Sequence, residues 1–189
     1  ELLPWMHNYS ETVRDVLTLT LYTGLRSGEV CRLRDDWLVE DVEAWSILIP
    51  SHEMKVPHAD HVVPLVGRAL EIARKRRGSG YWFKSRTGGH IKQKVLGVEV
   101  YSHSGRSKAK TYKAQTICPV IDWSPNDLRK TARTHLAKLK CPYEIGEKIL
   151  HHKLLGVAGL YNQYNYEEER REWLTTLGDH FDMLGRTNP

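Results

Sequence analysis

The sequence of 189 residues has no apolar stretch approaching the length of a membrane span, and its start does not resemble a signal peptide. Its three cysteines, Cys31, Cys118 and Cys141, lie far apart and outside any metal-ligand spacing. Their odd number argues against a disulfide framework, so we expect a reducing, cytoplasmic setting. Neither a Gly-rich phosphate loop nor a cluster of carboxylates is visible, which disfavours the common nucleotide-binding and metal-dependent phosphoryl-transfer sites.

The composition is that of one soluble globular domain, long enough to bury a core. Hydrophobic residues make up 40% and charged residues 27% of the chain. The net charge of +5 and the pI of about 9.1 suit a polyanionic partner, although many other soluble proteins are equally basic. Because the chain lacks an initiator Met and opens on an amphipathic pattern, we expect residues 1–189 to be a single domain belonging to a longer protein.

Three helices are expected in the N-terminal half. Apolar residues recur at helical spacing from Val13 to Thr20, and Gly24 is placed to end this helix. Ser27 is expected to cap a second, short helix. A third helix is expected over residues 65–77, before a Gly-Ser-Gly sequence.

A β-hairpin is expected between the second and third of these helices. Residues 45–49 are rich in β-branched and aromatic side chains and predict a strand, which a polar turn at residues 51–60 joins to a partner strand at residues 62–63. Farther along, residues 101–119 are polar and basic with few apolar anchors. They are interpreted as a mobile surface loop, with a DNA-contacting loop as the alternative.

The C-terminal half is strongly helical. Ser124, Pro125 and Asp127 predict a helix start, with a cap, a proline at the first helical position and an acid in the first turn. Pro142 begins another helix that runs through Leu150. One face of the helix that starts at residues 124–127 is formed by Leu128, Ala132, His135, Leu136 and Leu139. The chain is therefore expected to be mainly α with a small antiparallel β-sheet.

A last helix is expected after Asn165, which forms a capping-box pattern with Glu168. Its apolar side chains are spaced so that they share one stripe, which suits packing within the chain or onto a neighbouring copy. They are Trp173, Leu177, Phe181 and Leu184.

Two arginines are placed to bind an anion. Arg26 lies between the end of one predicted helix and the start of the next, where backbone amides and the helix dipole favour negative charge. Arg129 lies about one turn after Asn126 on a well-capped helix, so both can project from one face. A lone arginine is most often an ordinary surface residue. Two guanidiniums together would match the oxygens of a phosphodiester transition state.

Three ordered segments resemble the signatures of the tyrosine recombinase (phage integrase) family. They are TGLRSGEV at residues 23–30, NDLRKTARTHL at residues 126–136 and HHKLLGVAGLY at residues 151–161. Together they are spread over most of the length of the chain, which makes the match far more specific than one motif would be. The sequence after the third, at residues 161–171, resembles integrases of prophages and genomic islands. The resemblance implies the mainly α catalytic domain of that family, with its N-terminal DNA-binding domain absent.

The resemblance implies that Tyr161 attacks the scissile phosphorus and leaves a 3′-phosphotyrosine and a free 5′ hydroxyl. Tyr161 follows His152 by nine residues, which favours it over Tyr164 and Tyr166. His152 is expected to hydrogen-bond a phosphate oxygen or assist proton transfer. Its neighbour His151 is expected to point elsewhere.

The resemblance also implies a lysine on a β-hairpin that protonates the departing 5′ oxygen. Lys55 is the candidate, in the segment MKVPHADHVVPL, with Lys84 and Lys92 as weaker competitors. Glu29 is expected either to orient Arg26 or to be a simple surface acid. No metal or other cofactor enters the expected reaction, since the arginines supply the charge that Mg²⁺ supplies in many nucleases.

The chain departs from the family at the first position of the second signature, which is normally His or Lys and here is Asn126. An amide can donate a hydrogen bond to a phosphate oxygen, but it cannot exchange a proton near neutral pH. We therefore expect Asn126 to retain only a positioning role.

The function expected from the resemblance is site-specific DNA recombination or integration, independent of metal and ATP. The expected partner is double-stranded DNA, on which the family implies a tetramer, with weak association or a monomer without DNA and possible accessory DNA-bending proteins. A type IB topoisomerase would share the same chemistry but only relax strands. A non-catalytic basic DNA-binding module would explain the charge and Asn126, but not the register of the other candidate residues.

Overall fold

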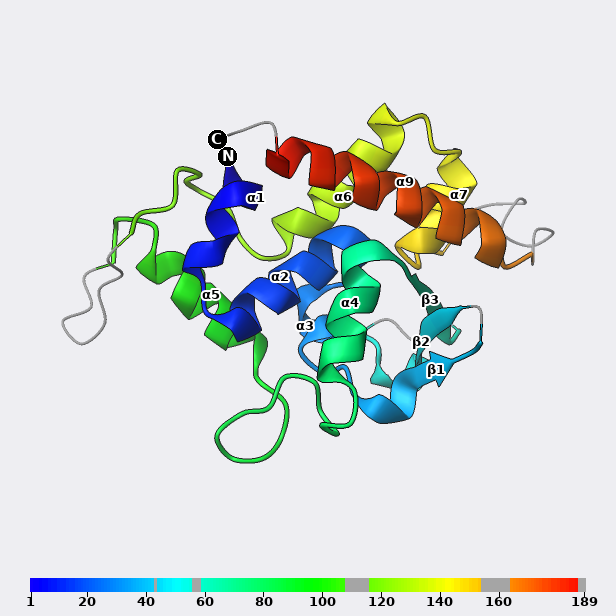
Figure 1. Ribbon diagram of the computed structural model, residues 1–189, viewed down its shortest axis with the longest axis horizontal. Helices are drawn as coiled ribbons and strands as arrows, with labels where there is room; N and C mark the ends of the chain where they lie inside the picture. The colour runs from blue at the N-terminus through cyan, green and yellow to red at the C-terminus, as the bar shows by residue number, and fades with distance from the viewer. Residues whose placement is uncertain (43, 56–58, 108–115, 154–163, 187–189) are drawn as a thin grey trace.

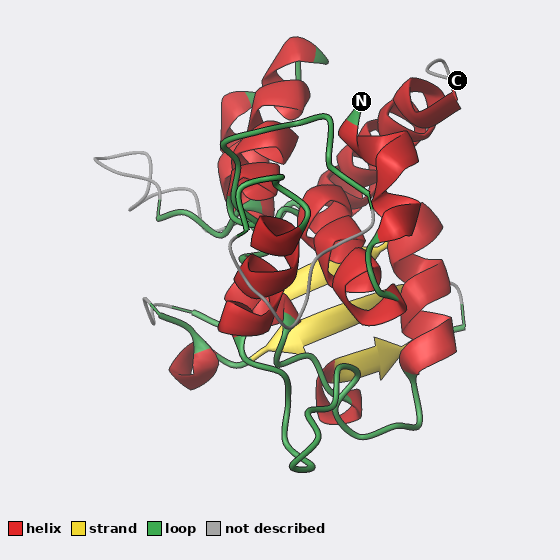
Figure 2. Cartoon of the chain, turned by 90° about the vertical axis from the view of Figure 1, so that its left-hand side faces the viewer, coloured by secondary structure: helices red, strands yellow, loops and turns green. Residues whose placement is uncertain are grey.

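The computed structural model describes residues 1–42, 44–55, 59–107, 116–153 and 164–186 (Figure 1). Helices form most of the molecule, and three strands form a small antiparallel sheet at one end, which confirms the expected fold class (Figure 2). No helix among these residues is both long and apolar enough to cross a membrane. The elements in chain order are α1 (Leu2–Trp5), η1 (Met6–Asn8), α2 (Glu11–Thr23), α3 (Ser27–Val30), η2 (Asp35–Trp37), β1 (Leu38–Glu40), β2 (Trp45–Ile49), η3 (Ser51–Glu53), β3 (His61–Leu65), α4 (Gly67–Arg76), α5 (Gln93–Ser102), α6 (Asp127–Lys138), α7 (Tyr143–Ile149) and α9 (Glu167–Arg186).

Helix α2 is the centre of the hydrophobic core. Its Val16 and Leu17 are fully buried, and it packs against α4, α6 and α9 (Figure 1). Gly24 ends α2 as expected, because it adopts the left-handed conformation at φ 71° and donates its amide hydrogen to the carbonyl of Thr20 at 3.1 Å. The chain can therefore turn sharply into α3, which places Arg26 at that turn.

The sheet has the strand order β1-β2-β3, and the expected hairpin is formed by β2 and β3. Trp45 pairs with Leu65, and Ile49 pairs with His61. The helix expected from residue 65 begins later, at Gly67, because Leu65 still belongs to β3. Strand β1 was not expected from the sequence. Lys55 lies in the connection between β2 and β3, at residues 50–60.

Two predicted helix caps are wrong by one or two residues. The N-cap of α3 is Arg26, and Ser27 lies inside the helix with its hydroxyl turned to the side chain of Asn126. The N-cap of α6 is Asn126 rather than Ser124, whose amide and hydroxyl both donate to the carboxylate of Asp127. These shifts place Arg26 and Asn126 at the starts of their helices.

Residues 101–119 are only partly the loop expected from their composition. Residues 101 and 102 belong to α5. Near the other end of the segment, Cys118 donates its amide hydrogen to the carbonyl of His103, the residue that follows α5, at 2.8 Å. Arg106 forms an ion pair with Asp122. The alternative interpretation, a DNA-contacting loop, includes the lysines at positions 108, 110 and 113, which lie outside the described residues.

Helix α9 buries two of the four residues of its expected apolar stripe. Leu177 and Phe181 are buried together with Leu174, whereas Leu184 is 40% exposed and Trp173 is half-buried. The helix runs across α6 and α7 and contacts β3 (Figure 1). The stripe is therefore used mainly for packing within the chain.

Replacing Gly24 with Ala is expected to lower the free energy of unfolding by about 1–2 kcal/mol. An added Cβ would adopt a disfavoured φ and meet Leu150 Cδ1 at 3.3 Å. Gly97, in the exposed middle of α5, has nothing within 4 Å of an added Cβ, so Gly97→Ala is expected to raise stability by about 1 kcal/mol. Urea unfolding measures the free energy of unfolding of both variants. The same change in both would contradict the prediction.

Candidate active site

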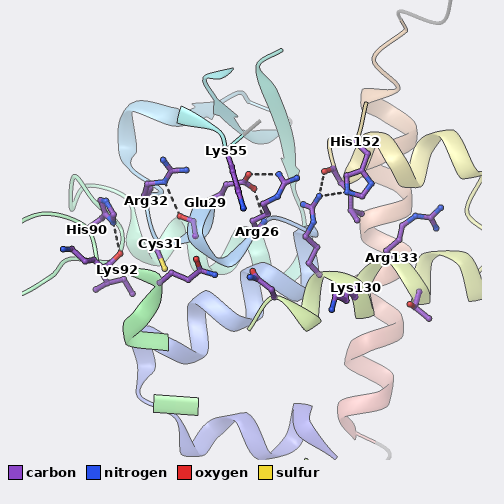
Figure 3. A pocket seen from close by; sticks show the side chains of 17 residues that line it. Arg26, Glu29, Cys31, Arg32, Lys55, His90, Lys92, Lys130, Arg133 and His152 are labelled. Atoms are coloured by element: carbon purple, nitrogen blue, oxygen red, sulfur yellow. Dashed lines mark hydrogen bonds and ion pairs between the residues drawn. The ribbon is translucent and has the colours of Figure 1, made fainter. Parts of the chain in front are cut away.

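A cavity of about 870 Å³ opens beside the start of α3, the start of α6 and the end of α7 (Figure 3). Five of the six residues predicted from the sequence line it, although they come from distant parts of the chain. They are Arg26, Lys55, Asn126, Arg129 and His152. Tyr161, the sixth, lies outside the described residues. The lining includes seven arginines and lysines and one carboxylate, that of Glu29.

Arg26 is held at the start of α3 by Glu29. One carboxylate oxygen accepts a hydrogen bond from Arg26 Nη1 at 2.9 Å, and the other accepts one from the Arg26 backbone amide at 3.0 Å. Glu29 is only 3% exposed, whereas the side chain of Arg26 is 31% exposed. Glu29 is therefore an orienting residue rather than a surface acid, and it leaves the Arg26 guanidinium accessible from the cavity.

Arg129 is the most deeply buried cation of the cavity, with 8% of its surface exposed. Its Nη1 donates to the carbonyl of Gly24, and its Nη2 donates to the carbonyl of Leu150, both at 2.6 Å. Nη2 also donates to His152 Nε2 at 2.9 Å. A guanidinium has five N–H donors, so these contacts occupy three and leave two for a ligand.

The environment of Arg129 lowers its pKa. Burial is the main cause, and the positive charge of Arg26 adds to it, so that the pKa of Arg129 falls to about 10. Arg129 remains protonated at neutral pH at this value. An anion bound between the two guanidiniums would relieve their repulsion.

His152 is oriented by a chain of hydrogen bonds that ends at α6. Its Nε2 accepts from Arg129, so the hydrogen of the neutral ring lies on Nδ1, which donates to Glu147 Oε2 at 2.8 Å. The other oxygen of Glu147 accepts from Arg133 Nε at 2.8 Å. Burial raises the pKa of Glu147, but hydrogen bonds from Arg133 and His152 outweigh it, and the net pKa lies below its usual value.

Asn126 is fixed by Ser27, which Gln93 holds in turn. Gln93 Nε2 donates to Ser27 Oγ at 2.9 Å, and Ser27 Oγ donates to Asn126 Oδ1 at 2.8 Å. Because its oxygen accepts, the amide presents its N–H groups as donors, and these have no partner among the described residues. An amide held in this way can donate to an anion in the cavity.

The three lysines considered as the acid are separated by the structure. Lys55 is exposed on the hairpin connection and lines the cavity, next to the buried Met54. Lys92 lines it too, from the start of α5. Lys84 does not line it and lies in a β-bridge with His90. Lys55 and Lys92 are therefore the two lysines that can reach a ligand there.

Three residues that shape the site were not expected from the sequence. Arg133 follows Arg129 by four residues on the same helix, so helical spacing could have placed it on the same face. Glu147 precedes His152 by five residues, but only the turn at the end of α7 brings them together. Gln93 carries no local signal. Among the described residues, no group of three His, Cys, Asp or Glu side chains is arranged to hold a metal ion.

Comparison with known sequences identifies one family. The family model of the phage integrase family matches residues 2–168, which is most of the chain. A search of curated protein sequences gave no match.

Solved structures similar to this chain share its fold at low sequence identity. The integrase from mycobacterium phage Brujita has a TM-score of 0.65 at 18% identity, over 89% of this chain and 52% of that chain. XerH site-specific recombinase, bound to its difH substrate, has a TM-score of 0.55 at 19% identity, over 92% and 51%. The Tn1549 transposon integrase, in complex with transposon right end DNA, has a TM-score of 0.55 at 16% identity, over 90% and 61%. This chain thus spans about half to three fifths of the length of these proteins.

Replacing Glu147 with Gln is expected to reduce the change in the free energy of unfolding that occurs as the pH falls into the acid range. The folded-state pKa of Glu147 is lowered, so the stability it adds is fully present above its ordinary value of 4.5 and is lost as the pH falls through the folded-state value. The variant should be less stable than the wild type at pH 6, and the difference should shrink toward pH 4. Urea unfolding at both pH values measures this, and a difference that grows on acidification would contradict it.

Proposed function

The chain belongs to the phage integrase family, and we propose that it cuts and rejoins DNA through a covalent bond to Tyr161. The observation that carries this proposal is that Arg26, Arg129 and His152 line one cavity together with Lys55. The similar structures support it, because XerH and the Tn1549 integrase are each bound to DNA. The proposed substrate class is therefore double-stranded DNA.

The proposed reaction is the attack of Tyr161 Oη on the scissile phosphorus. The new O–P bond forms as the bond between phosphorus and the 5′ oxygen breaks, which gives a 3′-phosphotyrosine and a free 5′ hydroxyl. The covalent bond conserves the phosphodiester, so the 5′ hydroxyl of another strand can attack it and reseal the DNA without ATP. Tyr161 lies nine residues after His152 in the sequence, and the proposal requires it to reach the cavity that His152 lines.

The two arginines are proposed to stabilise the transition state. Its phosphorus is pentavalent and carries more negative charge on its equatorial oxygens than the ground state does. Arg26 is accessible through its guanidinium, and Arg129 has two N–H donors left after its contacts with the protein. Asn126 can donate a further hydrogen bond to the same oxygens.

Two proton transfers are needed, and Asn126 can take part in neither. Lys55 is proposed to give a proton to the departing 5′ oxygen, since it lines the cavity from the hairpin. The proton of Tyr161 goes to water or to His152 Nε2, the ring nitrogen that carries the lone pair. His152 Nε2 can accept the proton only after Arg129 stops donating its hydrogen bond to it. We propose that Arg129 turns toward the phosphate when DNA binds, which leaves Nε2 available as the base.

The family implies that strand exchange takes place in a tetramer on two DNA sites, with accessory DNA-bending proteins as possible further partners. We propose that this chain supplies the catalytic domains of such an assembly and is monomeric or weakly associated without DNA. Its binding to DNA should weaken steeply with added salt, because its basic residues would contact phosphates.

The wild-type chain is expected to become covalently attached to a DNA duplex that carries a nick beside the cut site. The nick lets the short strand diffuse away, so the phosphotyrosine accumulates. Tyr161→Phe should abolish the adduct. Tyr164→Phe is the matched control, because Tyr164 is 58% exposed and only three residues away, and this variant should still form the adduct. Denaturing gel electrophoresis with labelled DNA measures the adduct.

An adduct that persists in Tyr161→Phe and disappears in Tyr164→Phe would show that Tyr164 is the nucleophile. No adduct with any DNA would contradict covalent catalysis. Transfer of the bound strand to a second duplex distinguishes a recombinase from an enzyme that only relaxes DNA.

Asn126→His is expected to leave the rate of adduct formation within about twofold, because the residue is proposed to position the phosphate and not to move a proton. Asn126→Ala, which removes the hydrogen-bond donors, is expected to lower the rate about 10–100-fold. Single-turnover cleavage of the nicked substrate measures both. A large rate increase in Asn126→His would show that proton transfer at this position limits the wild type.

A further inference from the structure

His151 contacts the hairpin that carries Lys55. Its ring stacks on His61, with 4.4 Å between the ring centroids and 22° between the planes. Its Nε2 lies 3.1 Å from the carbonyl oxygen of Ala59, and because a carbonyl can only accept, Nε2 is the donor. His151 therefore points away from His152 as expected, but it points to the hairpin rather than to solvent.

The backbone of His151 is in an unfavourable conformation. Its φ is 53°, in the left-handed region that glycine adopts without cost and that residues with a Cβ rarely adopt. A glycine would serve the turn at the end of α7 equally well. A strained conformation persists where the surroundings compensate for it, and here the contacts of the imidazole ring provide the compensation.

His61 is a firm surface for this contact. It is the first residue of β3, is paired with Ile49 of β2, and is 2% exposed. The pKa of His61 lies well below its ordinary value, first because of burial and then because of electrostatic interactions with His151 and three nearby arginines. The ring is thus neutral and can stack closely on its neighbour.

The hairpin connection needs such a contact. A hydrogen bond from the Ser51 amide to Asp60 Oδ1, at 2.8 Å, closes its base, and Lys55 is exposed between these residues. An exposed lysine samples many rotamers. The bond from His151 to Ala59 attaches the returning arm of the connection to the residue that precedes His152.

We infer that His151 is a positioning residue that locks the Lys55 hairpin onto the turn carrying His152, with His61 as the surface on which it stacks. The inference rests on the proposed function, because it assigns Lys55 the role of general acid. His151 would keep Lys55 at the distance from the phosphorus that proton transfer requires. It would thereby act on the departure of the 5′ oxygen without touching the DNA itself.

His151→Gly tests this inference, because glycine retains the left-handed turn and removes only the ring. On an ordinary DNA substrate its cleavage rate is expected to fall about 10–100-fold, as misplaced catalytic groups generally cause. On a substrate with sulfur in place of the bridging 5′ oxygen, the defect should disappear. The P–S bond breaks to release a thiolate, and because a thiol has a pKa of about 8.5, this leaving group needs no acid. Lys55→Ala should show the same pattern with a larger defect.

Lys140→Gly is the matched control, since Lys140 also has a positive φ, of 67°, and does not line the cavity. It should cleave both substrates like the wild type. Hydrogen exchange gives a readout independent of catalysis: the amides of residues 51–55 and 59–61 should exchange faster in His151→Gly than in either the wild type or Lys140→Gly.

An equal loss of cleavage on both substrates, or no loss on either, would overturn the inference. Unchanged hydrogen exchange in the hairpin would overturn it as well. If the wild type cleaves neither substrate, the proposed function fails. Hydrogen exchange then still decides whether His151 orders the hairpin.

Discussion

The burial of Arg129 is the constraint on which the rest of the site depends. A buried cation is costly unless its charge is compensated, and here two backbone carbonyls compensate it. Gly24 and Leu150 follow the last residues of α2 and α7, so both carbonyls belong to helix ends, where unpaired oxygens and the helix dipole favour positive charge. One side chain of α6 thus joins the ends of two other helices. The turn that carries Arg26 and the turn that carries His152 are fixed relative to each other as a result.

This arrangement concentrates positive charge where it is not neutralised. Three of the outer cations of the cavity have a carboxylate partner, since Arg32 pairs with Glu53, Lys130 with Asp127 and Arg133 with Glu147. Arg129 has no carboxylate partner among the described residues, and its pKa is lowered first by burial and then by the nearby guanidinium of Arg26. An anion such as a phosphodiester would remove this repulsion. Arg26 is paired with Glu29, so the uncompensated charge of the inner pair is that of Arg129, and a bound phosphate would be drawn to it.

Much of the fold follows from local patterns in the sequence. The period of the apolar residues gave α2, α6 and α9, and Gly24 marked the end of α2 because few other residues accept its φ. Exact helix starts were less predictable. Ser27 and Ser124 are good caps in isolation, but their hydroxyls donate to Asn126 and Asp127 instead. Strand β1 and helix α5 lack a clear period, and packing against the rest of the chain decides their structure.

The candidate site was predictable to the extent that its residues lie in recognisable segments. Arg26, Lys55, Asn126, Arg129 and His152 could be named in advance, and the structure brings them to one cavity. Residues that act through others could not be named. Gln93 fixes Asn126 only through Ser27, and His151 meets Ala59 across a separation of 92 residues. Such contacts depend on how distant elements pack, which no local pattern records.

A crystal structure of the chain with cleaved DNA and orthovanadate, which mimics the pentavalent phosphorus, tests directly whether the candidate residues form one catalytic site. We expect vanadium bonded to Tyr161 Oη, with its equatorial oxygens accepting hydrogen bonds from Arg26, Arg129 and Asn126, and with Lys55 beside the 5′ oxygen. Vanadate bound elsewhere, or bound in the cavity with the two guanidiniums turned away from it, would show that they do not.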